Sequence, residues 1–128
     1  MRLAGHIENI SCYLAACDLL VITSEREGMS LGMLEALQAG VPVLSTPVSG
    51  ATELLPDKAL IQSLNPEHLA AQLLQTLSHP DALMQSLQGV FQRVQNQMSS
   101  PQLARRTLDI YQQLVSKRSP NDLNDALT

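Results

Sequence analysis

The sequence has few aromatic residues and no tryptophan. The three aromatic residues are Tyr13, Phe91 and Tyr111, so the core must be built from Leu, Val, Ile, Ala and Met. There is therefore no series of aromatic side chains on which nucleic-acid bases could stack. The net charge of −4 also argues against a nucleic-acid partner, because a surface that follows phosphates needs a basic stripe.

Cysteines and long apolar runs are also scarce. Cys12 and Cys17 lie five positions apart, which is neither a zinc-binding nor a redox spacing. We expect them to be reduced core thiols of a cytosolic protein. Asp18 interrupts the longest apolar run, which is far shorter than the ~20 residues that span a bilayer. Because no signal peptide is visible either, we predict a cytoplasmic location.

The composition is that of a globular protein, with 45% hydrophobic and 16% charged residues. The charges are unevenly distributed. Residues 82–118 carry five basic and one acidic side chain, whereas residues 1–81 carry three basic and nine acidic ones. One interpretation is a solvated basic helix face. The other is weak peripheral association with the anionic inner face of a membrane.

Alternating apolar patterns predict an α/β fold with a parallel sheet. Residues 19–22 form a continuous apolar run that suits a strand covered on both faces. A helix over residues 30–39 and a second strand over residues 41–45 follow. Such a strand, helix and strand order predicts parallel strands joined by a right-handed crossover.

Further elements are expected on both sides of this unit. Before it we expect the end of a strand at residues 3–6 and a helix over 8–16 with Ile10, Tyr13, Leu14 and Cys17 on one face. After it we expect a helix at 51–55, a brief strand at 59–62 and a helix that starts at Pro66 with Asn65 as its cap. Helices over 81–97 and 101–115 complete the chain.

Glu35 is the one charged side chain between Gly28 and Thr52. The surrounding helix is apolar nearly all round, which predicts burial on more than one side. A carboxylate on such a helix is costly unless it is hydrogen-bonded. Alternatively, Glu35 reaches water at the edge of the layer or pairs with an Arg or Lys.

Glu27 has two interpretations. Ser24-x-x-Glu27 fits a capping box, in which the Glu only serves the helix backbone. Gly28 and Gly32 would then lie inside the helix, at ~1 kcal/mol each relative to Ala. A helix that starts between Gly28 and Ser30 fits better. Glu27 would then end a loop beside exposed N–H groups, where an anion can bind.

The loop over residues 46–50 follows the second strand. Ligands of open α/β sheets bind at the carboxyl ends of the strands. Ser49 and Gly50 are therefore candidates to present backbone to a diphosphate or a sugar. The alternative for Gly50 is an ordinary turn residue in the left-handed region.

Three segments resemble one enzyme family. Residues 27–36, Glu-Gly-Met-Ser-Leu-Gly-Met-Leu-Glu-Ala, resemble the Glu-x7-Glu signature of the retaining glycosyltransferases of family 4, usually E-G-F-G-L-x-x-L-E-A. Residues 16–24 are similar to the family's A-D-V-F-V-x-P-S, and residues 40–54 to its G-x-P-V-V-x-T-x-x-G-G-x-x-E-x. The three segments occur in the family's order and spacing.

The resemblance implies site residues and a substrate class. Glu27 would be the catalytic residue, touching the donor sugar near the reacting carbon, and Glu35 would bond the ribose hydroxyls. The remaining donor-binding residues would be Gly28, Met29, Ser30 and Leu31, with Ser49 and Gly50 in a donor loop. Ser30 stands where the family usually has Gly. The donor would be a UDP-, GDP- or ADP-sugar, with no cofactor and no metal.

The resemblance runs from about residue 3 to residue 80 and implies the carboxyl-terminal, Rossmann-like donor domain of the GT-B fold. Residues 1–117 would be a partial nucleotide-sugar-binding domain with carboxyl-terminal helices, and residues 118–128 a flexible tail. In the family, the acceptor site lies upstream. So do two basic residues, an Arg and a Lys, that neutralise the diphosphate of the donor. We therefore expect the chain alone to be inactive and a missing amino-terminal domain to bind the glycan, lipid-linked or small-molecule acceptor.

The missing strands would leave one sheet edge unpaired, which predicts self-association. Two other functions stay open at this point. One is a non-catalytic module that binds a nucleotide or a protein partner. The other is a nucleotide-sugar epimerase of the same fold.

Overall fold

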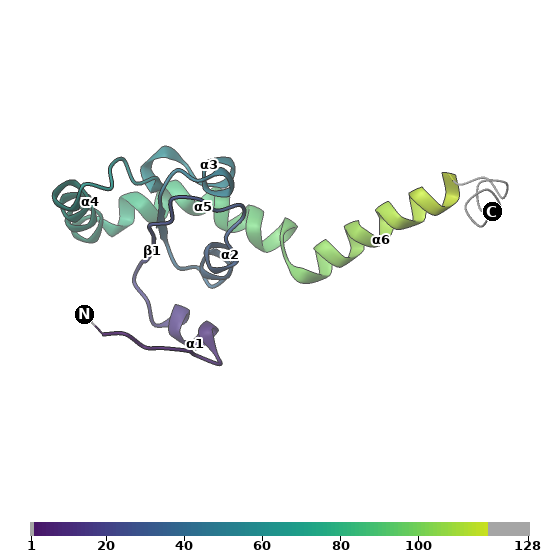
Figure 1. The fold of residues 1–128 in the computed structure, drawn as a ribbon, viewed down its shortest axis with the longest axis horizontal. Coiled ribbons are helices and arrows are strands. Elements are labelled where there is room, and N and C mark those ends of the chain that lie inside the picture. The colour runs from purple at the N-terminus through teal and green to yellow at the C-terminus, as the bar shows by residue number, and fades with distance from the viewer. Residues whose placement is uncertain (1, 118–128) are drawn as a thin grey trace. The chain divides into compact units, whose positions relative to one another are not determined.

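The computed structural model describes residues 2–117, and the chain divides into two units, residues 1–95 and residues 96–128. The first unit contains α1 (Ile10–Ala15), β1 (Leu20–Ile22), α2 (Leu31–Gln38), β2 (Val43–Ser45), α3 (Ser49–Leu54), the 3-10 helix η1 (Asp57–Ala59), α4 (Pro66–Ser78) and all but the last residues of α5 (Pro80–Gln97). α6 (Ser100–Lys117) belongs to the second unit. Figure 1 shows the fold, with the colour running along the chain from purple at the amino terminus to yellow at the carboxyl terminus.

The first unit is built on parallel strands, as the alternating pattern predicts. β1 pairs with β2 in parallel, with Leu20 opposite Val43 and Ile22 opposite Ser45. Leu60 extends the sheet by one parallel bridge to Ser45. This arrangement confirms the predicted fold class, a partial Rossmann-like α/β domain with a helical carboxyl-terminal part.

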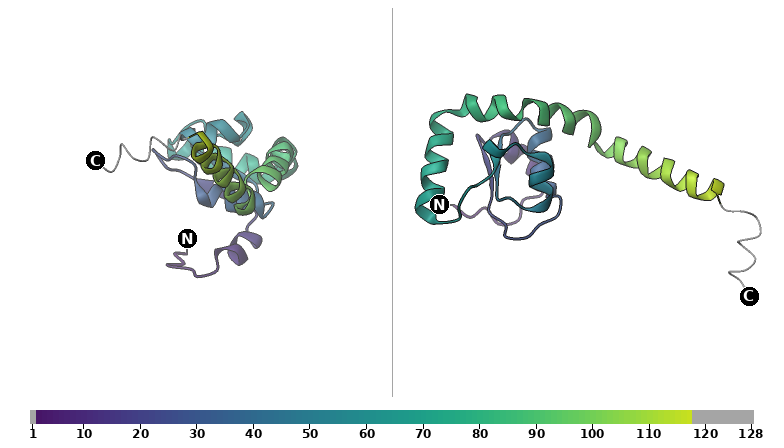
Figure 2. Two further views of the ribbon diagram at one scale, coloured as in Figure 1. Left: turned by 90° about the vertical axis from the view of Figure 1, so that its right-hand side faces the viewer. Right: turned by 90° about the horizontal axis from the view of Figure 1, so that it is seen from above.

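The core is aliphatic, as the scarcity of aromatic residues requires. α2 buries Met33, Ala36 and Leu37, and all three residues of β2 are buried. α5 adds the buried side chains of Leu83, Leu87 and Val94. α4 has no buried residue, and it meets α5 at a corner beside the sheet (Figure 2).

Local signals set the helix ends where the sequence predicts them. The Asn65 side chain accepts hydrogen bonds from the backbone N–H groups of Glu67 and His68, and Pro66 is the first residue of α4. Gly40 follows α2 with φ of 76°, a conformation that a residue without a Cβ adopts at no steric cost. Both ends are therefore explained by residue chemistry.

The amino-terminal predictions are partly wrong. Residues 3–6 form no strand, and Gly5 has a positive φ of +68°. Of the four residues expected on the inner face of α1, only Leu14 is buried, whereas Ile10, Tyr13 and Cys17 are exposed. Amphipathic spacing predicts which face of a helix is apolar, but not whether another element packs against that face.

Two further predictions need correction. Cys12 and Cys17 are free and exposed rather than core thiols, because they lie on and just after α1, of which only Leu14 is buried. The brief strand expected at residues 59–62 is reduced to the bridge at Leu60, since Ala59 ends η1. The Ala59 N–H donates to the Pro56 carbonyl and not to a neighbouring strand.

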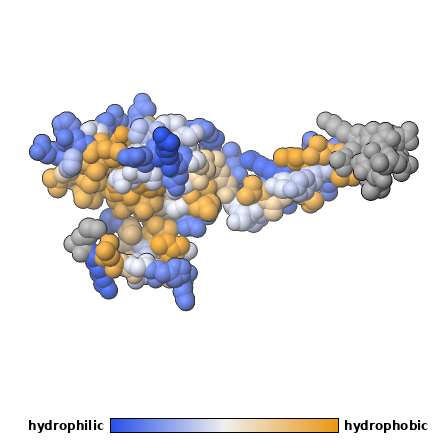
Figure 3. Space-filling view, viewed as in Figure 1, coloured by the Kyte–Doolittle hydropathy of each residue, from blue (hydrophilic) through white to orange (hydrophobic). Residues whose placement is uncertain are grey.

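α6 is a long amphipathic helix within the second unit. Its exposed apolar residues recur at helical spacing, namely Leu103, Leu108, Ile110, Tyr111, Leu114 and Val115. Figure 3 shows patches of orange, hydrophobic surface along this helix. Across the part of the chain that the structure describes, no helix has the length and apolarity needed to cross a membrane. The predicted flexible tail, residues 118–128, lies outside the described residues.

Candidate functional site

Two loops meet beyond the carboxyl ends of the parallel strands. The first, the 23–30 loop, connects β1 to α2 and carries Glu27. The second connects β2 to α3 through Thr46, Pro47 and Val48. In open α/β sheets this edge is where ligands bind, so the topology places the predicted site residues at the expected end of the sheet.

Two hydrogen bonds hold the 23–30 loop, one from the second loop and one from the first turn of α3. The Thr46 hydroxyl donates to the Ser24 carbonyl at 2.5 Å, and Thr46 is buried. The backbone N–H of Gly50 donates to the Gly28 carbonyl at 3.1 Å. Ser24 and Gly28 flank Glu27 in sequence, so the segment that carries Glu27 is held on both sides.

Glu27 does not cap a helix. α2 begins at Leu31, and the Ser30 hydroxyl accepts from the Met33 N–H at its amino terminus. The capping box is therefore wrong, and the later helix start is confirmed. Glu27 is half-buried, and its Oε2 atom is buried without a hydrogen-bond partner among the described residues. That oxygen can accept a bond from a ligand hydroxyl.

Glu35 is exposed, so the expectation of a helix buried on more than one side is wrong. α2 packs through Met33, Ala36 and Leu37, while Leu31 on its other side is 73% exposed. The alternative in which Glu35 reaches water is the correct one. Its carboxylate is accessible to a ligand without the loss of an internal hydrogen bond.

The residues between the two glutamates form an open surface. Gly28, Met29 and Leu31 are exposed, and Ser30 is half-buried. A Cβ at Gly28 would meet nothing within 4 Å. The fold therefore leaves space beside Glu27, as a bound sugar or phosphate would need.

Ser49 and Gly50 differ from each other. Ser49 is exposed and Gly50 is buried. The φ of Gly50 is not positive, which excludes the turn in the left-handed region, and its N–H already bonds Gly28. The role of this pair in donor binding stays a prediction, with Ser49 as the accessible member.

A cavity of about 360 Å³ opens beside the joined loops. The residues that line it follow β1, β2 and the Leu60 bridge in the chain. They are Ser24, Glu25, Thr46, Pro47, Val48, Ile61, Gln62, Ser63 and Leu64. None of these nine residues is among the site residues predicted from the sequence, and neither Glu27 nor Glu35 lines this cavity. The available signal was their position just after a strand, because every such segment ends at the same edge of a parallel sheet.

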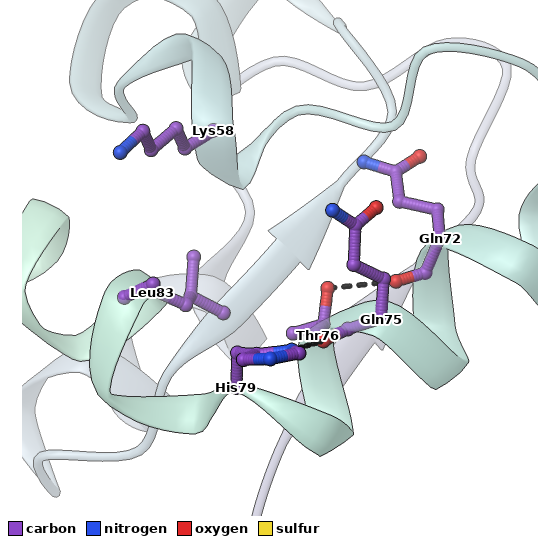
Figure 4. Close-up of a pocket in the computed structure, with 7 residues that line it drawn as sticks. Lys58, Gln72, Gln75, Thr76, His79 and Leu83 are labelled. Carbon is purple, nitrogen blue, oxygen red and sulfur yellow. Dashed lines mark hydrogen bonds between the residues drawn. The ribbon is translucent and has the colours of Figure 1, made fainter.

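A second cavity, of about 430 Å³, lies among η1, α4 and α5 (Figure 4). In it, Thr76 Oγ1 donates to the Gln72 carbonyl at 2.8 Å, and His79 Nδ1 lies 3.4 Å from the Gln75 carbonyl. Lys58, which lines this cavity, precedes Leu60 in the chain. It therefore lies on the amino side of the strand position at Leu60. The ligand rule for α/β sheets therefore favours the first cavity. Within residues 2–117, no three His, Cys, Asp or Glu side chains are grouped to hold a metal ion.

Comparison with known proteins bears on the family of the chain. A profile of the family described as glycosyl transferases group 1 matches residues 1–79, more than half of the chain. Over 51 residues the chain is 39% identical to N-acetyl-alpha-D-glucosaminyl L-malate synthase of Bacillus anthracis. That alignment covers 40% of the chain and 13% of the relative, so the chain matches a small part of that protein's length.

Proposed function

The chain belongs to the group 1 glycosyl transferases, and on this premise we propose that its 23–30 loop and α2 bind the donor of a retaining sugar transfer. The donor is a UDP-, GDP- or ADP-sugar. Glu27 contacts the sugar, Glu35 accepts hydrogen bonds from the ribose hydroxyls, and the backbone from Gly28 to Leu31 lies beside sugar and phosphate.

The buried, unpartnered Oε2 atom of Glu27 carries this proposal. Leaving a buried polar atom without a partner costs ~1–3 kcal/mol, and more when it is charged. Folded proteins rarely keep such an atom unless something outside the fold satisfies it. A sugar hydroxyl would supply the missing donor, and the carboxylate would also stabilise positive charge as the sugar–phosphate bond breaks.

Accessibility supports the other roles. Glu35 is exposed on the same helix whose first turn follows Glu27. A carboxylate accepts two hydroxyl donors at once, which suits the paired hydroxyls of a ribose. A Cβ at Gly28 would meet nothing within 4 Å, which supports a donor sugar or phosphate beside this backbone.

The relative suggests which ligands to test first. Its name describes a synthase of N-acetyl-alpha-D-glucosaminyl L-malate, so N-acetylglucosamine is the first sugar to try on the donor. Malate is the first small-molecule acceptor to try, ahead of glycan and lipid-linked acceptors. Because inverting and hydrolytic enzymes use paired carboxylates differently, we assign no nucleophile.

Calorimetry on the 128-residue chain tests donor binding. UDP, GDP and ADP are titrated first, followed by the N-acetylglucosamine or glucose conjugate of each. We expect one nucleotide to bind and its sugar conjugate to bind more tightly, with the additional affinity lost in Glu27→Ala. Equal affinities of wild type and Glu27→Ala for the conjugate would refute the sugar contact. The absence of binding by every nucleotide would refute the proposed donor site.

A further inference from the structure

We propose that Gly50 and Thr46 are positioning residues that hold the 23–30 loop, and with it the Glu27 carboxylate, in the geometry needed for donor binding. The effect on donor affinity rests on the proposed function. The effect on the loop itself can be measured without any ligand.

Gly50 lies too close to the loop for any side chain. A Cβ at this position would be 2.4 Å from the Gly28 carbonyl oxygen and 2.7 Å from the Met29 Cα atom. Ordinary contacts begin near 3.4 Å, so the two segments would have to separate by about 1 Å. Both contacted atoms belong to the backbone, which cannot rotate away as a side chain can.

The loop, rather than α3, would move. α3 and its carboxyl end are anchored by the buried side chains of Ala51, Leu54 and Leu55. By contrast, Glu25, Arg26, Gly28 and Met29 are exposed. A methyl group at position 50 would therefore displace the loop outward, break the bond from the residue 50 N–H to Gly28 and shift the adjacent Glu27.

Thr46 fixes the same segment at its start. Its buried hydroxyl donates to the Ser24 carbonyl, and the Thr46 N–H donates to the Ile22 carbonyl at the end of β1. Thr46 thus binds the last residue of β1 and the beginning of the loop at once. Together, Thr46 and Gly50 hold the loop on either side of Glu25, Arg26 and Glu27.

The first measurement is the mobility of the loop in the free protein. Backbone ¹⁵N relaxation of residues 24–29 is compared for wild type, Gly50→Ala and Thr46→Val. We expect increased mobility in both variants. Gly89→Ala is the matched glycine control, because its Cβ meets nothing within 4 Å in an exposed part of α5. Thr52→Val is the threonine control, because the Thr52 hydroxyl bonds the Ser49 carbonyl and not the loop.

The second measurement is donor affinity. A shift of Glu27 would weaken its charge-assisted hydrogen bond to the donor sugar, and the loss of such a bond corresponds to ~10-fold or more in affinity, so Gly50→Ala should weaken binding of the nucleotide sugar at least ~10-fold. The free nucleotide should lose less, since it does not reach Glu27. Thr46→Ser keeps the hydroxyl and should restore both the rigid loop and the affinity that Thr46→Val loses.

The two measurements separate the possible failures. If wild type binds no nucleotide sugar, the proposed function fails while the relaxation data still decide whether Gly50 and Thr46 hold the loop. Unchanged loop mobility in both variants would overturn the positioning role, as would equal affinity losses for nucleotide and conjugate. If Gly50→Ala does not fold, the Thr46→Val and Thr46→Ser pair decides the question.

Discussion

Glu27 and Glu35 lie in different environments although one sequence signature contains both. Glu27 holds a buried oxygen that no described residue bonds, whereas Glu35 is exposed on α2. The buried oxygen of Glu27 therefore costs stability in the free protein, whereas the exposed Glu35 carries no such cost. Substitutions at the two positions should differ in stability as well as in binding.

For Glu27→Ala, we expect the free energy of unfolding to stay within about 0.5 kcal/mol of wild type or to rise. The variant loses no internal hydrogen bond and removes an oxygen whose burial costs ~1–3 kcal/mol. Urea unfolding measures the difference. Ser30→Ala is the control, since it removes the side chain that caps α2 and should cost ~0.5–2 kcal/mol. A loss of that size in Glu27→Ala would mean that Glu27 has a structural partner.

For Glu35→Ala, we expect binding of the free nucleotide and of its sugar conjugate to weaken equally, by ~1.5–3 kcal/mol, because a bond to a charged group is lost. Stability should not change, since Glu35 is exposed. Calorimetry with both ligands provides the measurement. Glu53→Ala, at an exposed position in α3, is the control. Unchanged nucleotide affinity in Glu35→Ala would exclude the ribose contact.

The elements differ in how well the sequence alone predicts them. α4 follows from Asn65 and Pro66, since a cap and a first-turn proline act locally. The burial of α2 does not follow, because Glu35 lies among apolar residues whose exposure depends on what packs beside them. Leu31 is apolar and exposed for the same reason. Periodicity thus predicts a helix but not which of its faces is covered.

The candidate site also combines features that the sequence predicts with features that it does not predict. The sequence places Glu27, Gly28 and Glu35 around the start of α2, because capping and helix propensity act over a few residues. It does not predict that Gly50 lies against Gly28, since that contact joins segments far apart in the chain. Residues 61–64 enter the cavity for a similar reason. Contacts between segments need the tertiary fold.

At the scale of the elements, α5 should matter more for stability than α4. Leu87 in α5 is fully buried, whereas Leu74 in α4 is 67% exposed. We expect Leu87→Ala to lower the free energy of unfolding by ~2–5 kcal/mol, the range for large-to-small changes in a core. The matched change Leu74→Ala should stay within about 0.5 kcal/mol, as is usual at the surface. Chemical denaturation of both variants tests this ranking, and equal losses would contradict the packing described here.

At the scale of the whole molecule, the sheet formed by residues 2–117 has an edge on which no described strand pairs. β1 pairs with β2 and with no other strand of the described residues. Leu20 and Ile22 direct their backbone groups toward β2, as their bonds to Pro42 and Thr46 show. Successive residues of a strand direct their backbone groups to opposite sides. The N–H and carbonyl of Val21 therefore point to the free edge. Such an edge is a template for pairing with another chain.

Exposed apolar surface also favours self-association. Ile10, Tyr13 and Leu31 of the first unit are exposed, and Figure 3 shows apolar residues at its surface. α6 offers a separate route through its own apolar stripe, because no other helix lies within the second unit among the described residues. Self-association therefore has two candidate surfaces, and each can be removed independently.

We expect the 128-residue chain to self-associate through the free edge of β1 as its concentration rises, as measured by light scattering. Val21→Pro should reduce association because it removes an N–H that faces the edge and leaves the β1–β2 bonds in place. Leu20→Pro is the contrasting variant, since it removes the donor of the 2.9 Å bond to Pro42 and should unfold the sheet in circular dichroism. If Val21→Pro associates like wild type while Ile110→Lys is monomeric, α6 is the interface. A monomeric wild type at high concentration would contradict association by either surface.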